Sequence, residues 1–109
     1  MAFTEKRIGA ILPTMASLAT LYAVPTDTTT VIKNLQICNN ATLAALSSVF
    51  LTPTGDTPDT TTAILYEFSV PAKQAINWEM WQVLENGAIM VKLETGSSTT
   101  YTASGMEIT

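Results

Sequence analysis

Turn-forming residues recur at short intervals along this chain and leave only short segments between them. These segments are rich in β-branched residues, and many of them alternate between apolar and polar side chains. Short alternating segments separated by regular turn signals are typical of a β-sandwich or a β-barrel. The turns are expected at residues 25–27, 39–40, 53–56, 71–73, 86–87 and 96–98.

The polarity of the intervening segments predicts seven β-strands. The clearest alternation is at Ile89, Val91 and Leu93, which are expected to face the core. Met90 lies between them and is expected to face solvent or a partner. The strands are expected near residues 19–24, 31–38, 46–52, 63–70, 74–80, 88–94 and 101–108.

Three other strands have informative patterns. Leu35 and Ile37 alternate with polar residues and are expected to point inward. Around Phe50 both faces of the strand are apolar, which indicates either a central strand or one whose outer face meets another subunit. In the strand near residues 63–70, the large apolar side chains are expected to share one face; they are Ile64, Tyr66, Phe68 and Val70.

Composition supports an all-β, single-domain protein. The chain has 109 residues, a length typical of one domain with its own core. Charged residues make up only 13 %, about half of the usual share, and threonine supplies much of the remaining polarity. Threonine is β-branched and suits a half-exposed pleated surface. We therefore expect an antiparallel β-sandwich, of jelly-roll or immunoglobulin-like type, with about seven to eight strands.

The first eighteen residues have a less regular pattern. Residues 1–18 can form an edge strand, a short helix or an extended N-terminal arm, and Pro13 excludes only an uninterrupted helix. Residues 19–109 are expected to form the β-sandwich domain itself. An apolar arm on a small domain tends to dock, either on its own sheet or on a neighbour, so Ile8, Ile11 and Leu12 are candidate contact residues.

An enzyme is not expected. The chain has no histidine, which removes the commonest general base and the commonest zinc ligand. The five glycines are dispersed and form no phosphate-binding loop; Gly105, within a strand, indicates a bulge or a close approach of two backbones. Cys38 is the only cysteine, so no disulfide can form within the chain, and it is expected to be a small buried residue.

Nucleic acid and membrane are not expected as partners. The net charge is −4, and the five cationic residues are scattered, whereas binding to a phosphate backbone requires clustered lysine and arginine. No apolar run reaches the length of about 18 residues that a membrane-spanning helix needs. A surface with so few charges suits protein–protein contacts, because charge is depleted at the centre of interfaces.

Two acidic pairs are candidates for chemical sites. Asp56 and Asp59 lie among threonines, but two carboxylates fall short of the six to eight oxygens that calcium takes, so a polar turn is the favoured interpretation. Glu79 and Glu85 flank Trp81, an arrangement that can resemble a sugar-cleaving pair. Without a second aromatic platform, solvated acids near a turn are favoured. We expect no catalytic residue, no metal and no cofactor.

Two tryptophans three residues apart pose the question of a binding site. Ile76, Trp78 and Met80 alternate as they would in a strand, so Trp78 is expected to point inward. Trp81 then lies on the opposite side and is expected to contact another protein subunit.

The order of motifs resembles a family of small structural proteins of tailed bacteriophages. "TLYAVPTDTTTVIKNLQICNNAT" resembles that family's "LYTVPAGTTAIVKSIxxxNT" opening, and "VFLTPTGDT" stands where the family has a strand and turn. The segment from "ILYEFSVPAKQAINWEM" to the C-terminus resembles its closing motifs, so the likeness runs from about Thr20 onward. The family's acidic residue after a turn glycine is replaced by Ala88, a departure that affects a turn and not the sandwich.

This resemblance implies a β-sandwich subunit of the virion with no catalytic residues. The expected function is capsid decoration, in which the protein binds and stabilises the particle. It is expected to be a homo-oligomer, a trimer by analogy with decoration proteins. Its expected partners are the major capsid protein or other virion proteins. A neck, tail or baseplate component is the alternative, as is a carbohydrate- or receptor-binding module. The expected location is the virion, assembled in the host cytoplasm. The candidate contact residues are Trp81, Phe50, Met90, Ile8, Ile11 and Leu12.

Overall fold

The structure is a computed structural model that describes residues 3–52 and 62–109. These residues form eight β-strands and no helix, which confirms the all-β prediction. They contain no helix that is long and apolar enough to cross a membrane. The strands are β1 (Phe3–Ile11), β2 (Leu18–Ala23), β3 (Thr29–Asn39), β4 (Ala45–Thr52), β5 (Ala63–Val70), β6 (Ala75–Leu84), β7 (Ala88–Thr95) and β8 (Thr99–Ile108).

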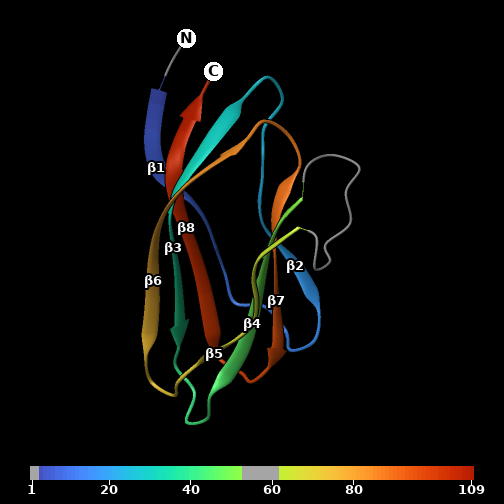
Figure 1. Cartoon of the computed structure of the whole chain (residues 1–109), viewed down its shortest axis with the longest axis vertical. Coiled ribbons are helices and arrows are strands. Elements are labelled where there is room, and N and C mark those ends of the chain that lie inside the picture. Colours follow the sequence, from blue (N-terminus) through green and yellow to red (C-terminus); the bar gives the residue numbers. More distant parts are fainter. Residues whose placement is uncertain (1–2, 53–61) are drawn as a thin grey trace.

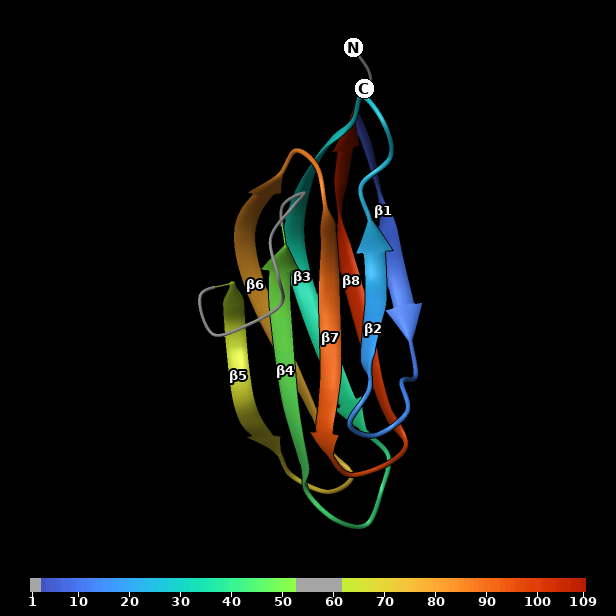
Figure 2. The ribbon, with the colours of Figure 1, turned by 90° about the vertical axis from the view of Figure 1, so that its right-hand side faces the viewer.

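The eight strands form two four-stranded antiparallel sheets that pack face to face as a sandwich (Figures 1 and 2). The first sheet has the order β1-β8-β3-β6 and the second has the order β2-β7-β4-β5. Strand β1 pairs with β8, β2 with β7, β3 with β6 and β4 with β5, as in one long hairpin rolled into a barrel-like sandwich. This is the jelly-roll arrangement, one of the two sandwich types that the sequence predicts.

The core lies between the two sheets and includes the side chains of β3 and β7 that the alternation predicts to point inward. Ile89, Val91 and Leu93 are all buried, as are Leu35 and Ile37. These positions confirm the prediction for β7 and β3. The core cluster also receives Tyr101 and Ala103 from β8, Val49 from β4, and Leu21 and Tyr22 from β2.

Strand β4 is a central strand of the second sheet, between β7 and β5. This explains why both of its faces are apolar. Val49 points into the core and is fully buried, whereas Phe50 points to the outer face and is still only 3 % exposed. The Phe50 ring is covered in part by Tyr66, whose ring centroid lies 6.4 Å away in an edge-to-face arrangement.

The prediction that Ile64, Tyr66, Phe68 and Val70 share one face is wrong. Strand β5 has a bulge, where Tyr66 and Glu67 together lie opposite Ser48, and Glu67 adopts a positive φ of 49°. The extra residue shifts the alternation, so Tyr66 points to the outer face beside Phe50, whereas Phe68 and Val70 remain on the inner face, with Phe68 against Trp78. Val70 is buried, but the other three side chains are between 37 % and 50 % exposed.

Bulges and glycines allow the strands to approach closely. In β1 and in β2 one extra residue turns a hydrophobic side chain into the core; these residues are Ile8 and Leu21. Gly9 lies where the backbones of β1 and β2 meet, because a Cβ atom there would be 2.2 Å from the Leu21 carbonyl oxygen. Gly105 faces a bulge in β3, as its position within a strand predicts.

Candidate interaction surfaces

The exposed large apolar side chains lie mainly along two opposite edges of the sandwich. Figure 2 shows that β5 and β6 form one edge, and that β1 and β2 form the other. Strand β5 provides Ile64, Tyr66 and Phe68, and β6 provides Trp81 and Val83. We call these five residues the β5–β6 edge. The opposite group consists of Leu12, Met15 and Leu18, and we call it the β1–β2 edge.

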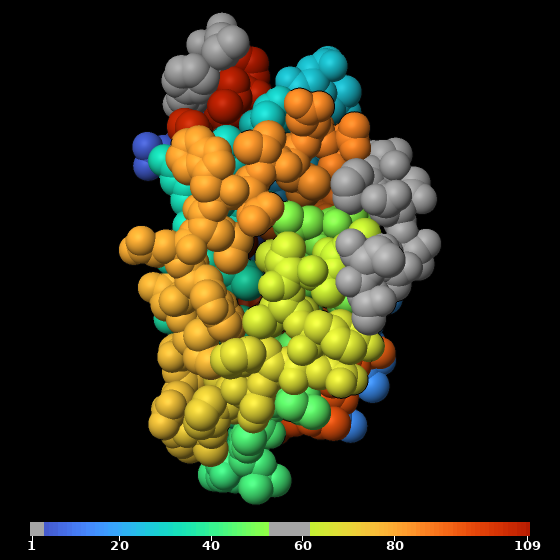
Figure 3. All heavy atoms as spheres, in the orientation of Figure 1, coloured from blue at the N-terminus to red at the C-terminus, as the bar shows by residue number. Residues whose placement is uncertain are grey.

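The β5–β6 edge is held together by an aromatic contact between the two sheets. The Phe68 and Trp78 ring centroids are 5.3 Å apart at an interplanar angle of 80°, a favourable edge-to-face geometry. In the space-filling view, the side chains of β5 and β6 lie side by side on one face of the molecule (Figure 3). This edge is therefore a continuous surface that bridges both sheets.

The β1–β2 edge is built on the connection between the first two strands. Ala16 adopts a positive φ of 64°, and its amide donates to the Leu93 carbonyl over 2.7 Å. This hydrogen bond ties the connection to β7, and it leaves Leu12 and Met15 more than half exposed. Leu18 follows at the start of β2 and is 48 % exposed.

The six predicted contact residues fall into three groups. Trp81 and Leu12 are strongly exposed, at 66 % and 62 %. Ile11 and Met90 are partly exposed. Phe50 and Ile8 are buried within the chain, so they contribute no exposed surface: a central strand carries Phe50, and the bulge of β1 turns Ile8 inward.

Sequence reasoning missed most of the exposed apolar residues. Tyr66 and Phe68 were expected to share one face, but the bulge between them turns Tyr66 to the outer face and has no clear signature in the sequence. Val83 and Leu18 were not identified, although both lie at the end of an edge strand. Leu43 is 75 % exposed and lies apart from both edges, in the connection between β3 and β4.

The two tryptophans occupy different environments. Trp78 is partly buried and packs against the core cluster together with Ile76 and Met80. Trp81 lies on the outer face, and the Lys33 ammonium is 5.8 Å from its ring centroid. At this distance a cation–π contact is formed at an exposed site.

Half of the charged side chains of the described residues are in ion pairs. Lys6 binds Glu107, Lys33 binds Glu5, and Lys92 binds Glu94. Within residues 3–52 and 62–109, these pairs leave Arg7 and Lys73 as cations without an ion pair. The acidic residues without one are Asp27, Glu67, Glu79 and Glu85.

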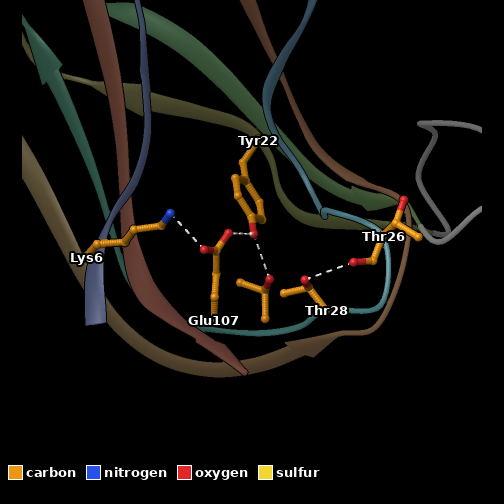
Figure 4. A network of polar contacts seen from close by, with 6 residues as sticks. Lys6, Tyr22, Thr26, Thr28 and Glu107 are labelled. Carbon is orange, nitrogen blue, oxygen red and sulfur yellow. Dashed lines mark hydrogen bonds and ion pairs between the residues drawn. The ribbon is translucent and has the colours of Figure 1, made fainter. Parts of the chain in front are cut away.

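A polar network closes one end of the sandwich (Figure 4). The Tyr22 hydroxyl from β2 donates to the Glu107 carboxylate on β8 and contacts the Thr30 hydroxyl at 2.8 Å. The Lys6 ammonium lies 2.7 Å from the same carboxylate. Burial raises the pKa of the Tyr22 hydroxyl to about 12, and the hydrogen bond to Glu107 adds to the rise. A hydroxyl that stays protonated suits a hydrogen-bond donor that links two strands and not a general base. We call the network of Lys6, Tyr22, Thr30 and Glu107 the clamp.

This clamp predicts a specific response to acid. The Lys6 ammonium and then the Tyr22 hydroxyl lower the pKa of Glu107, so its carboxylate favours the folded state. That contribution is present above the pKa of the unfolded chain and is lost as the pH falls through the lower pKa of the folded state. Glu107→Gln should cost about 1 kcal/mol at pH 7 and less at pH 3.

Denaturant titrations at both pH values test this expectation. Glu85→Gln, at an exposed acid, is the control and should leave the acid response close to that of the unchanged protein. An equal loss from Glu107→Gln at pH 3 and pH 7 would contradict the clamp.

No chemical site emerges from the acidic pairs. Residues 3–52 and 62–109 contain no cluster of three or more residues able to hold a metal ion. Glu79 and Glu85 are both exposed. Asp56 and Asp59 lie outside the described residues. An open hollow at one end of the sandwich is lined by residues 24–29 and 85–87.

Cys38 is partly exposed and not buried as expected. It lies on the outer face of β3, where it alternates with the inward-facing Ile37.

Comparison with known proteins defines the fold class only. No protein-family model and no curated protein matches this chain. A solved structure described as Bacillus endospore appendages, a family of disulfide-linked pili, is similar with a TM-score of 0.56 and 13 % identity, over 98 % of this chain and 88 % of that one. This similarity establishes a shared β-sandwich fold.

A second solved structure has weaker similarity. It is that of infectious bursal disease virus, Gx strain, with a TM-score of 0.47 and 12 % identity. The match covers 97 % of this chain but only 32 % of the viral chain. The score is too low to support an argument about this protein.

Proposed function

We propose that this protein is a structural subunit that works in many copies through protein–protein contacts, and that it is a capsid decoration subunit of a tailed bacteriophage. The observation that carries the proposal is the pair of exposed apolar edges on a sandwich that has few charges. Large exposed apolar groups on a small soluble domain mark interaction sites. Aromatic residues such as Trp81 and Tyr66 are also enriched at interfaces.

The outer face of the first sheet supports this proposal. It carries a band of uncharged polar side chains in register across three strands: Ser104 and Thr102 from β8, Asn34 and Gln36 from β3, and Asn77 from β6. A band of uncharged side chains can be desolvated at lower cost than charged ones. Such a band suits close packing against an underlying shell.

The family resemblance and the fold comparison support the same class. The motifs from Thr20 onward resemble structural proteins of tailed phages. The similar sandwich from the Bacillus endospore appendages belongs to pili, so this fold can serve in a repeating assembly. For the phage subunit, the expected partners are the major capsid protein and sister copies of this chain. By analogy with decoration proteins, the sister copies are expected to form a trimer. Trp81, Leu12, Ile11 and Met90 are the proposed contact residues.

Light scattering and particle binding test this function. The purified protein should be oligomeric, or it should co-sediment with purified phage capsids with submicromolar affinity. Trp81→Ala should weaken that association, whereas Leu43→Ala, at an exposed site away from both edges, should not.

Two results would contradict the proposed function. A strict monomer that ignores purified capsids and tails would exclude a multi-copy structural subunit. Binding to host cells or to a glycan array that is lost in Trp81→Ala would instead identify a receptor-binding module.

A further inference from the structure

We propose that neighbouring copies of this chain associate head to tail, with the β5–β6 edge of one copy against the β1–β2 edge of the next. The inference rests on the proposed multi-copy function and specifies its contact. The partner is a second copy of this chain, because the two edges are complementary in charge and both carry exposed apolar side chains. The strand register determines which residues of the two edges lie at the same level.

In the first sheet, Arg7 and Glu79 lie at opposite ends of one row. Arg7 of β1 aligns with Ser104 of β8, which aligns with Asn34 of β3. Asn34 in turn aligns with Glu79 of β6. A second copy placed beside the first along this row therefore brings Arg7 of one copy next to Glu79 of the other.

In the second sheet, Leu18 and Tyr66 lie at opposite ends of another row. Leu18 of β2 aligns with Lys92 of β7, which aligns with Ser48 of β4. Ser48 lies opposite the bulge of β5 that contains Tyr66, and its hydroxyl accepts a hydrogen bond from the Glu67 amide over 3.0 Å. A second copy placed beside the first in the same way therefore brings the apolar Leu18 of one copy next to Tyr66 of the other.

The charges left unpaired within the chain favour this arrangement over a symmetric one. Lys6 and Glu5 on β1 are already engaged with Glu107 and Lys33, which leaves Arg7 as the charge of that strand that forms no ion pair with another described residue. On the opposite side, β5 has Glu67 and β6 has Glu79, and neither forms an ion pair with another described residue. A two-fold contact between like edges would bring like charges together wherever its axis passes near Arg7 or near the acids of the β5–β6 edge.

The remaining cation lies outside both rows. Lys73 is in the connection between β5 and β6, at the end of the sandwich, and its ammonium donates to the Asn40 carbonyl over 2.8 Å. It therefore does not neutralise the row that ends at Glu79. This makes Lys73 a suitable control for a change of charge.

The direction of the edge strands is compatible with the contact. We expect the contact to be made by side chains and not by backbone pairing. Successive strands in each sheet are antiparallel, so β6 of one copy would run antiparallel to β1 of the next. Bulges in β1, β5 and β6 interrupt the regular edge backbone, which opposes continuous strand pairing. A heterologous contact of this kind closes a ring or continues as a filament, depending on the rotation between copies.

Paired charge reversals test the contact. Arg7→Glu makes both ends of the first-sheet row negative, and Glu79→Arg makes both ends positive. Each variant alone should associate at least ten-fold more weakly than the unchanged protein at low salt, because like charges meet at every contact. An equimolar mixture of the two should associate again. Where the two variants alternate along the assembly, every contact places a positive residue of one variant against a negative residue of the other. Analytical ultracentrifugation measures all three samples.

The controls carry the same charge changes at exposed sites outside the rows: Lys73→Glu and Glu85→Arg. Neither control should impair association alone, and circular dichroism should show that all four variants remain folded. Association of the unchanged protein that is insensitive to both reversals, or a mixture that stays dissociated, overturns this contact and leaves the multi-copy function standing. A monomer that nevertheless binds capsids overturns only the self-contact, whereas a monomer that binds none overturns both.

Discussion

Replacing Trp78 with alanine should lower the free energy of unfolding by about 3 kcal/mol. The Trp78 side chain packs against the core cluster and makes an edge-to-face contact with Phe68 across the two sheets. Its removal takes apolar surface from the core and leaves the Phe68 ring without its partner. Because the ring is only partly buried, the loss should lie at the lower end of the range for large aromatic residues.

Trp81→Ala is the matched control for this prediction. It removes the same side chain three positions away, where 66 % of the residue is exposed and the described contact is with Lys33. The loss should be below about 1 kcal/mol in the monomer. Guanidinium titrations followed by far-ultraviolet circular dichroism measure both variants without depending on tryptophan fluorescence. Equal losses at the two positions would show that their faces are misassigned.

Gly105→Ala should destabilise the fold by a comparable amount, about 3 kcal/mol. A Cβ atom at this position would lie 2.2 Å from the Val31 carbonyl oxygen and 3.2 Å from the Ile32 Cα atom. Both neighbours are backbone atoms of the paired strand β3, so no side-chain rotation can relieve the overlap. The strands must separate, which weakens the central β3–β8 pairing of the first sheet.

Ser104→Ala provides the control for the glycine variant. Ser104 precedes Gly105 in β8 and is partly exposed on the outer face, so its replacement should change stability by less than about 0.5 kcal/mol. Thermal and guanidinium unfolding of both variants test the comparison. A Gly105→Ala protein as stable as the Ser104→Ala protein would show that the close approach of β8 to β3 is not required.

The strands and most of the core could be predicted because turn residues and alternation are local signals. Ile89, Val91 and Leu93 alternate without interruption, so their inward direction followed directly from the sequence. The apolar faces around Phe50 similarly indicated a central strand. These features depend on a few consecutive residues and do not require knowledge of strand order.

The errors arose at bulges and edges, where strand pairing decides the outcome. The bulge at Glu67 turns Tyr66 away from the face that Phe68 and Val70 share, and no glycine or proline marks it in the sequence. The alignment of Arg7 with Glu79 depends on two intervening strands, so it became visible only once the register was known. Trp81 and Leu12 could be identified as exposed from sequence alone, but not the edges to which they belong.

An electron-microscopy reconstruction of virus particles or other assemblies purified from the source of this chain tests the proposed function most directly. The proposed function predicts repeated jelly-roll densities on the capsid surface. The proposed self-contact predicts that the β5–β6 edge of one copy faces the β1–β2 edge of its neighbour. A particle with no density for this chain, and with no copies detected by quantitative mass spectrometry, would contradict its role as a structural subunit.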